Sequence, residues 1–349
     1  MDNLELVVWE FTLGCNYRCV HCASACGDRK EGELSTEEAL DAARQIAALK
    51  PGRVTLTGGE PLLREDFLTV ARTFHSLGQN VDFISNGALM TEEIARGVQE
   101  YCNLAAISID GPRELHDLIR GAGAWQKAER AFSMLRGKIP LGSNTTVMKA
   151  NIDLLPQIRD ELQGLGVAVW QLQPAILFGN MRADEIILPD DLERIIEFAY
   201  EENLKDGIRI YLPDNVGYYT EKECIARQCL IGSSEPPMWH GCNAGLRSIG
   251  LLHNGDVIGC TAIRDRRFIE GNIRERPLAD ILNSPDSFAW RKNLRPEDFS
   301  GHCADCPYIK HCLGGCSAMR LAYYGDIHAS NGYCVYAVKH QAARAGAAP

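Results

Sequence analysis

Short apolar runs alternate with helical segments over the first two thirds of the chain. Six runs have the length and composition of buried strands, and most end in Gly, Asn, Asp or Pro: 6–12, 53–57, 80–85, 104–109, 141–148 and 167–174. Segments with helical periodicity follow them: 35–49, 66–77, 91–98, 125–136, 154–165 and 189–205. Because parallel strands need crossover connections, this order predicts an α/β fold with a parallel sheet.

Two architectures satisfy this alternation, a doubly wound sheet and an incomplete barrel. Both place the functional site at the carboxyl ends of the strands. Ser35 and Glu38 form a capping-box pattern that marks the start of the first helix.

After Leu212 the pattern changes to short strands, glycine-rich turns and cysteines, with strands expected at 246–252 and 256–260. This change predicts a boundary near residues 213–225. We therefore expect three parts, an α/β unit, a cysteine-rich unit and a flexible tail: 1–215, 216–340 and 341–349.

Composition and charge exclude several classes of protein. Apolar residues make up 46% and charged residues 23% of the chain, as in ordinary globular proteins. The net charge of −10 argues against nucleic acid as the main partner. The first ten residues lack the basic start of a signal peptide, and no apolar stretch approaches the roughly 18 residues that cross a bilayer. We expect a cytoplasmic protein that does not enter membranes.

In a reducing compartment, the 14 cysteines are better explained as metal ligands or reactive thiols than as disulfides. Four lie between Cys15 and Cys26, nine lie between Cys224 and Cys334, and Cys102 stands alone. Two groups about two hundred residues apart indicate two metal regions.

The first group contains Cys15, Cys19 and Cys22, directly after the first strand. Three thiolates within eight residues suit three irons of a [4Fe–4S] cluster and leave the fourth iron open to a substrate or cofactor. On spacing alone, a zinc site or unrelated buried thiols are alternatives. Cys26 is expected to be a spectator.

The second strand ends in Gly58-Gly59-Glu60-Pro61, and together with C-x3-C-x2-C this resembles the radical S-adenosylmethionine (SAM) superfamily. The resemblance implies a partial (βα)6 barrel similar to a TIM barrel. It also implies that SAM chelates the open iron and is cleaved to methionine and a 5′-deoxyadenosyl radical, which takes a hydrogen atom from the substrate. Gly58, Gly59 and Glu60 suit the amine of SAM, since glycines permit close backbone approach and a carboxylate pairs with an amine.

Other strand ends match the same family. By resemblance, Ser108 is a candidate for the SAM carboxylate, and Asp110 for the ribose or the site wall. Arg120 either reaches a carboxylate or forms a salt bridge in a surface loop.

Further candidates come from the remaining strands and from the cysteine loop. Asn144, Gln171 and Gln173 are expected to point into the mouth of the barrel. His21 stands where the family usually has an aromatic residue that packs near the adenine. Histidine departs from that pattern, and His21 is the candidate for the same contact.

The second cysteine group matches the seven-cysteine pattern of the SPASM domain: Cys242, Cys260, Cys303, Cys306, Cys312, Cys316 and Cys334. That resemblance implies two auxiliary [4Fe–4S] clusters, three clusters in all. The outer one would use Cys303, Cys306, Cys312 and Cys334. The inner one would use Cys242, Cys260 and Cys316, with a fourth ligand from upstream. Cys229 is expected in that place, Cys224 is the alternative, and an open iron is a third possibility.

SPASM enzymes include several kinds of maturase, and the segments here look most like maturases of ribosomally made peptides. Thr261 replaces the aspartate that sulfatase maturases carry after the cysteine matching Cys260, so that activity is not expected. We expect an oxidoreductase that acts on a peptide. It would form a thioether, ether or carbon–carbon crosslink, or carry out a related oxidation. The catalytic residues are left unassigned.

Three alternatives stay open. The first is an enzyme acting on a small molecule, such as a tetrapyrrole, a quinone-cofactor precursor or a sugar. The second is a peptide epimerase, which needs a hydrogen-atom donor. Cys102 and Cys224 are unassigned, but Cys102 is expected in the core. The third is a non-catalytic electron carrier, which needs no open iron or SAM pocket.

The expected partners are a precursor peptide and a flavodoxin- or ferredoxin-type electron donor. Because the first strand begins by residue 6, we expect no leader-recognition domain before it. Either a separate leader-binding protein presents the peptide, which is the expectation here, or the substrate needs no leader.

Overall fold

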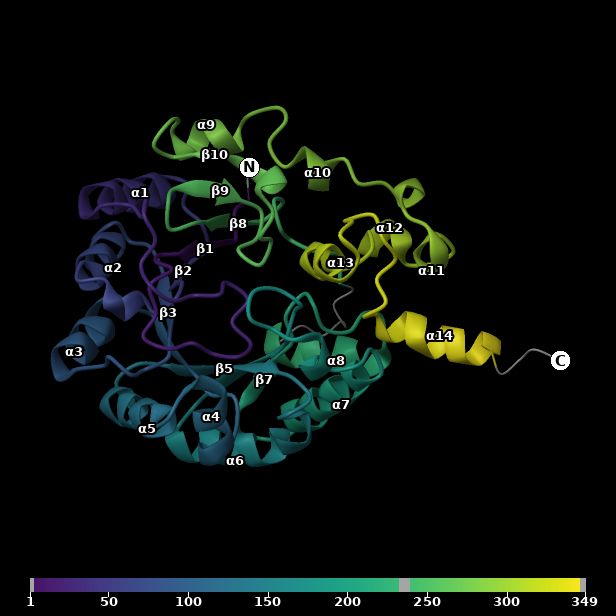
Figure 1. Ribbon diagram of the computed structural model, residues 1–349, viewed down its shortest axis with the longest axis horizontal. Helices are drawn as coiled ribbons and strands as arrows, with labels where there is room; N and C mark the ends of the chain where they lie inside the picture. The colour runs from purple at the N-terminus through teal and green to yellow at the C-terminus, as the bar shows by residue number, and fades with distance from the viewer. Residues whose placement is uncertain (1–2, 232–238, 346–349) are drawn as a thin grey trace.

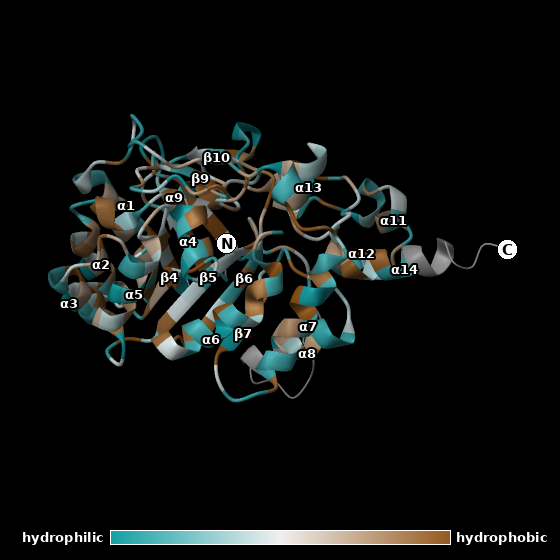
Figure 2. Ribbon diagram, turned by 60° about the horizontal axis from the view of Figure 1, so that its bottom comes forward, coloured by the Kyte–Doolittle hydropathy of each residue, from teal (hydrophilic) through white to brown (hydrophobic). Residues whose placement is uncertain are grey.

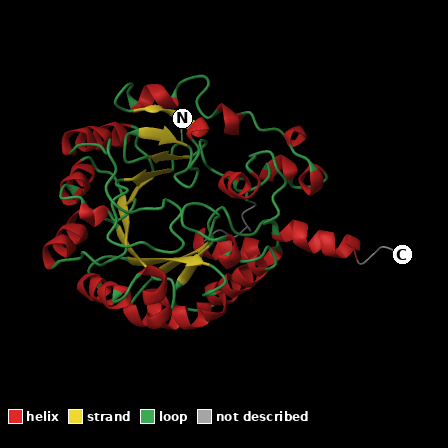
Figure 3. Ribbon diagram, viewed as in Figure 1, coloured by secondary structure: helices red, strands yellow, loops and turns green. Residues whose placement is uncertain are grey.

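One curved sheet of ten strands organises the molecule (Figures 1 and 3). The computed structural model describes residues 3–231 and 239–345, with side chains at 3–227 and 239–340. The strand order is β10-β9-β8-β1-β2-β3-β4-β5-β6-β7. The strands are β1 Leu6–Glu10, β2 Arg53–Thr57, β3 Val81–Ser85, β4 Leu104–Ser108, β5 Leu141–Val147, β6 Val169–Pro174, β7 Arg209–Tyr211, β8 Ser248–Leu251, β9 Asp256–Ile258 and β10 Ile269–Asn272.

Helices cover the outer side of this sheet and continue into the C-terminal region. The first eight are α1 Thr36–Ala48, α2 Phe67–Ser76, α3 Glu92–Tyr101, α4 Arg113–Arg120, α5 Ala124–Leu135, α6 Leu155–Leu165, α7 Asp191–Asn203 and α8 Glu221–Ile231. The last six are α9 Leu278–Leu282, α10 Ala289–Lys292, α11 Gly301–Ala304, α12 Ile309–Cys312, α13 Ser317–Tyr324 and α14 Val335–Ala345. Figure 2 shows helices carrying both apolar and polar residues, as expected where one helix face lies on a sheet.

The partial barrel is confirmed, and β1 to β7 pair in parallel and in sequence order. The capping box is also confirmed. Ser35 Oγ accepts from the Glu38 amide at 3.2 Å, and the Glu38 carboxylate accepts from the Ser35 amide at 2.7 Å. Helix α4 was not predicted. Residues 113–120 come directly after the polar end of a strand, and their sequence indicated a loop.

The strands after residue 240 join the same sheet. β8 pairs in parallel with β1, and β9 and β10 then continue the sheet as antiparallel strands. The expected boundary between residues 215 and 216 therefore separates two cysteine regions but not two sheets. Helix α14 runs to Ala345, into the segment that was expected to be a flexible tail, and residues 346–349 lie outside the described part of the chain.

The main hydrophobic core draws on both regions. Trp9 on β1 is fully buried and makes edge contacts with Phe11 and Phe74 at ring-centre distances of 5.1 and 6.3 Å. Ile249 and Leu251 on β8 belong to the same core. No helix within the described residues is long and apolar enough to span a membrane.

A substitution on β8 tests whether the two regions share one core. Leu251 is 1% exposed and lies in register with Trp9, so Leu251→Ala should lower the free energy of unfolding by about 2–5 kcal/mol. Urea denaturation followed by circular dichroism should show one transition that shifts as a whole. Leu204→Ala, at a leucine that is 59% exposed, is the control and should change stability by less than about 0.5 kcal/mol. Two transitions, of which only one moves, would contradict a shared core.

Candidate active site

The first three cysteines lie in a loop between β1 and α1, at the carboxyl edge of the sheet. The loop closes on itself: the Cys15 amide donates to Gly27 O at 2.6 Å, and the Gly27 amide donates to Leu13 O at 3.0 Å. Cys15, Cys19 and Cys22 line one cavity of about 240 Å³. The loop thus presents three thiols to a single space.

The chemistry of this donor set fits a cluster with an open iron. Burial raises the pKa of the Cys19 thiol to about 11, whereas a hydrogen bond from Cys26 lowers the pKa of Cys22 to about 5. Within the residues whose side chains are described, no three His, Cys, Asp or Glu side chains converge on a single-ion site. Three thiols around a wider space would hold three irons of a [4Fe–4S] cube and would leave one iron without a protein ligand.

Cys26 has a larger role in the structure than the sequence indicated. It is 4% exposed, and its amide lies 3.4 Å from Cys22 Sγ. Its contacts with Cys22 orient the thiol of that predicted ligand. The position of Cys26 four residues after Cys22 in the sequence does not predict this contact.

Gly58 and Gly59 bring the end of β2 against the cysteine loop. The Gly59 amide donates to Thr12 O at 2.6 Å. A Cβ on Gly59 would lie 2.1 Å from Gly14 O, and one on Gly58 would lie 2.4 Å from Thr12 O. Only glycine permits this approach. Both glycines also line the cavity, where the sequence placed them.

Glu60 is fully buried and joins the ends of β2 and β3. Its carboxylate accepts from Ser85 Oγ at 2.8 Å, from the Asn86 amide at 2.8 Å and from the Leu62 amide at 3.1 Å. Burial raises its pKa to about 7 although these donors act in the opposite direction. The contact of Glu60 with the SAM amine stays a prediction.

Asp110 is the centre of a buried polar network rather than part of the cavity surface. It has no exposed area, and it accepts from Arg120 Nε at 2.6 Å and from the Thr146 amide at 2.9 Å, with His21 Nε2 at 2.7 Å. Burial alone raises the pKa of Asp110, but Arg120 and His21 outweigh it and lower the pKa strongly.

This network changes two expectations. The Arg120 side chain is 10% exposed, comes from the end of α4 and lines the cavity, so the surface-loop salt bridge is wrong. His21 also lines the cavity, with its ring tied to Asp110. Asp110 therefore acts on the cavity through Arg120 and His21, and its predicted ribose contact has no support in the geometry.

The candidates from β4 to β6 separate into two layers. Ser108, Thr146 and Gln173 line the cavity beside the cysteines. Asn144 and Gln171 point into the barrel two residues earlier on their strands, and they line a second cavity of about 270 Å³ near the amino ends of the strands. Their expected place at the barrel mouth is therefore wrong, because alternation predicts the face of a strand but not the depth along it.

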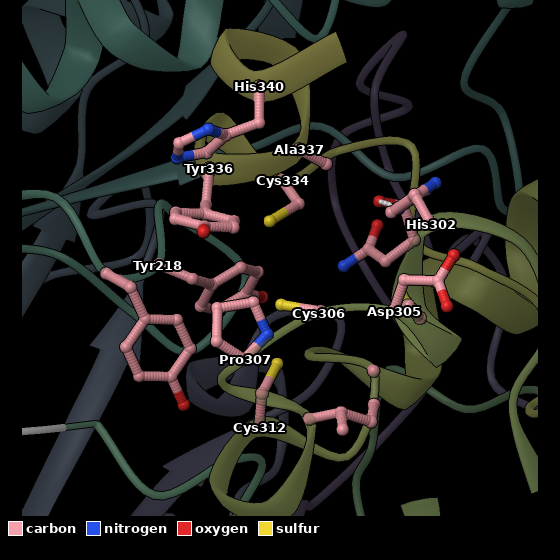
Figure 4. A pocket seen from close by; sticks show the side chains of 15 residues that line it. Tyr218, His302, Asp305, Cys306, Pro307, Cys312, Cys334, Tyr336, Ala337 and His340 are labelled. Atoms are coloured by element: carbon pink, nitrogen blue, oxygen red, sulfur yellow. Dashed lines mark hydrogen bonds between the residues drawn. The ribbon is translucent and has the colours of Figure 1, made fainter. Parts of the chain in front are cut away.

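The outer cysteine set gathers around one small cavity. Cys303, Cys306, Cys312 and Cys334 line about 120 Å³ together with Tyr218, and Figure 4 shows the thiols of Cys306, Cys312 and Cys334 directed into that space. Three short segments of the C-terminal region carry these cysteines, so the set forms only when those segments pack. The four thiols fit a second cluster.

The inner cysteine set is more buried than the outer set. Cys242, Cys260 and Cys316 are close enough for their charges to interact: burial and, after it, the charge of Cys242 raise the pKa of Cys260 to about 11. The side chain of Cys229 lies outside the described residues. Cys224 contacts Glu223 at 3.7 Å, and Cys102 lies in the main core. Which residue completes the inner set stays a prediction.

The glycine contacts of the cysteine loop generate a direct test. Gly59→Ala should displace the loop, lower the free energy of unfolding by about 1–3 kcal/mol and reduce the iron retained per chain after gel filtration. Gly164→Ala is the matched control, since a Cβ there meets nothing within 4 Å. Equal iron content and equal stability in the two variants would show that the contact does not hold the loop.

Comparison with known proteins places this geometry in a family. Residues 9–162 match the radical SAM superfamily, and residues 242–307 match the SPASM iron–sulfur cluster-binding domain. The chain is 32% identical to an AdoMet-dependent heme synthase of Methanosarcina barkeri, over 95% of this chain and 96% of the relative. It is 29% identical to the mycofactocin maturase MftC of Mycolicibacterium smegmatis, over 92% of this chain and 80% of the relative.

A solved structure shows the same fold. SuiB of Streptococcus suis bound to S-adenosylmethionine has a TM-score of 0.73 and 16% identity, covering 95% of this chain and 76% of that chain. Cavity, cysteine sets and relatives agree: the chain belongs to the radical SAM superfamily and is a SAM-dependent iron–sulfur enzyme with a SPASM domain.

Proposed function

We propose that the enzyme modifies a peptide, removing hydrogen from it and forming a crosslink or a related oxidised product. The observation that carries this proposal is the lining of the main cavity. Apart from His21, the one basic side chain among the described residues of this lining is Arg120, which is already paired with Asp110. The other polar side chains are neutral: Ser24, Thr57, Ser85, Asn86, Ser108, Thr146 and Gln173.

Neutral hydrogen-bonding groups suit the amides of a peptide. A tetrapyrrole with several carboxylates would need several cations around it, because buried charges must be paired. The similarity to mycofactocin maturases, at 28–29% identity over 92% of the chain, also supports a peptide.

A tetrapyrrole is the second candidate, and the relatives favour it. Three AdoMet-dependent heme synthases match this chain at 28–32% identity over 95% of its length, and an Fe-coproporphyrin III synthase matches at 26%. The proposal therefore has to be tested against a porphyrin directly.

When bound, SAM at the cluster supplies the radical that takes a hydrogen atom from the substrate. The chain's own part is to position the reactants. Gly58 and Gly59 offer close backbone contact, Ser108 offers a hydroxyl, and Arg120 is oriented by Asp110.

A crosslink removes two hydrogens from the peptide, so the reaction needs an electron acceptor besides the hydrogen-atom step. The inner cysteine region lies beside the main cavity, since Ala262, two residues after Cys260, is part of the lining. Buried Glu10 also joins the two loops: it accepts from Ser24 Oγ at 2.9 Å and from Arg264 at 2.6 and 3.0 Å. We assign the acceptor role to the C-terminal cysteine region. A flavodoxin- or ferredoxin-type donor and a separate leader-binding protein are part of this proposal.

Substrate class can be decided with anaerobically reconstituted enzyme, SAM and dithionite. Peptides encoded by short reading frames beside the gene should stimulate release of 5′-deoxyadenosine and lose two hydrogens by mass spectrometry. Iron coproporphyrin III should give neither stimulation nor a saturable shift of its absorption band. The Cys15→Ala variant is the control for radical formation. Tight porphyrin binding with stimulated 5′-deoxyadenosine release would overturn the peptide proposal.

A further inference from the structure

The inner cysteine set has three thiols among the residues whose side chains are described, Cys242, Cys260 and Cys316. A [4Fe–4S] cluster that serves only for electron transfer takes four protein ligands. The fourth ligand must come from a residue near all three thiols. Cys224 does not qualify within the described contacts, since its partner is Glu223 on the same helix.

Asp214, in the loop after β7, is fixed beside this set. Its Oδ2 accepts from the Asn243 amide at 3.2 Å, the residue next to Cys242, and its Oδ1 accepts from Trp239 Nε1 at 3.0 Å. These bonds hold the carboxylate in one orientation close to Cys242.

The same loop also reaches Cys316. Tyr218 Oη donates to the main-chain oxygen of Asp214 at 2.5 Å and accepts from the Cys316 amide at 3.2 Å. Tyr218 is fully buried, and its ring stacks on Trp239 at a centre distance of 4.3 Å. Asp214 is thus hydrogen-bonded to the backbone of Asn243, beside Cys242, and is connected through Tyr218 to the backbone of Cys316.

The backbone of this loop is strained. Tyr218 and Tyr219 have φ angles of +136° and +58°, which side-chain-bearing residues rarely adopt and which cost roughly 1–3 kcal/mol each. Such strain persists only where surrounding contacts enforce it, and it concentrates at functional sites. Here the contacts of Tyr218 with Asp214, Trp239 and the Cys316 amide enforce it.

The charge of Asp214 acts on all three inner thiols. Burial is the largest cause of the raised pKa of Cys242, and Asp214 is the next. Asp214 also raises the pKa of Cys260 and Cys316, after the effects of burial and of the neighbouring thiols. The Asp214 carboxylate is therefore near enough to each inner thiol for its charge to act on it.

We propose that Asp214 supplies a carboxylate oxygen as the fourth protein ligand of the inner cluster. Carboxylates are established ligands of iron, and ligating carboxylates are typically held by further hydrogen bonds, as Asn243 and Trp239 hold this one. Each oxygen of Asp214 accepts one of these bonds and retains a lone pair for iron. This inference depends on the iron–sulfur assignment and not on the identity of the substrate.

The test uses the full chain in a Cys15/Cys19/Cys22→Ala background, which removes the first cluster as a source of signal. After anaerobic reconstitution and mild oxidation, Asp214→Ala should lose about one iron per chain and give the EPR signal of a three-iron cluster, which oxidised four-iron clusters lack. Asp214→Cys should restore the iron and abolish that signal. Asp326→Ala, at an exposed carboxylate, is the control and should match the parent.

Two further variants separate the alternatives. Asp214→Asn keeps a hydrogen-bond acceptor for Trp239 and should show the same loss of iron, which distinguishes ligation from folding if Asp214→Ala is unstable. Cys229→Ala should leave the spectrum unchanged. A three-iron signal in Cys229→Ala but not in Asp214→Ala would assign the ligand to Cys229 and overturn the proposal. Unchanged spectra in both variants would mean an open iron and would overturn it too.

Discussion

The backbone contact between β2 and the cysteine loop is the constraint on which the active site depends. Gly59 and Glu60 donate their amides to Thr12 and Gly14 at 2.6 and 2.8 Å, and no side chain fits between these segments. The contact fixes the three thiols relative to the carboxyl ends of the strands. Thr146 on β5 pairs in register with Gln173 on β6, and both line the cysteine cavity together with Ser108 at the end of β4.

The continuity of the sheet fixes the position of the second cysteine region relative to the first. Because β8 pairs with β1, the chain after residue 240 returns to the strand that precedes the first cysteine loop. Buried Glu10 at the end of β1 then binds both Ser24 of that loop and Arg264, just after Cys260. The enzyme thereby holds its hydrogen-abstraction site and a candidate electron acceptor on a single rigid sheet.

Features set by local sequence could be predicted, and features set by distant packing could not. Alternating strands and helices predicted a parallel α/β sheet, and the resemblance of the motifs at residues 15–22 and 58–61 to a family predicted the partial barrel. Cysteine spacing predicted the outer set of thiols that the fold gathers. Alternation does not report depth, so Asn144 and Gln171 were placed one layer too high. The pairing of Arg120 with Asp110 and the position of Asp214 beside Cys242 each depend on how separate loops pack, and no spacing in the sequence encodes them.

The central claim is that this chain holds three clusters, one of them on Cys15, Cys19 and Cys22. Iron and sulfide content after anaerobic reconstitution tests it most directly. With four irons per cluster, the wild type should hold about twelve irons per chain and the Cys15/Cys19/Cys22→Ala variant about eight. About four irons in the wild type and none in the variant, with zinc bound in the C-terminal region, would contradict it.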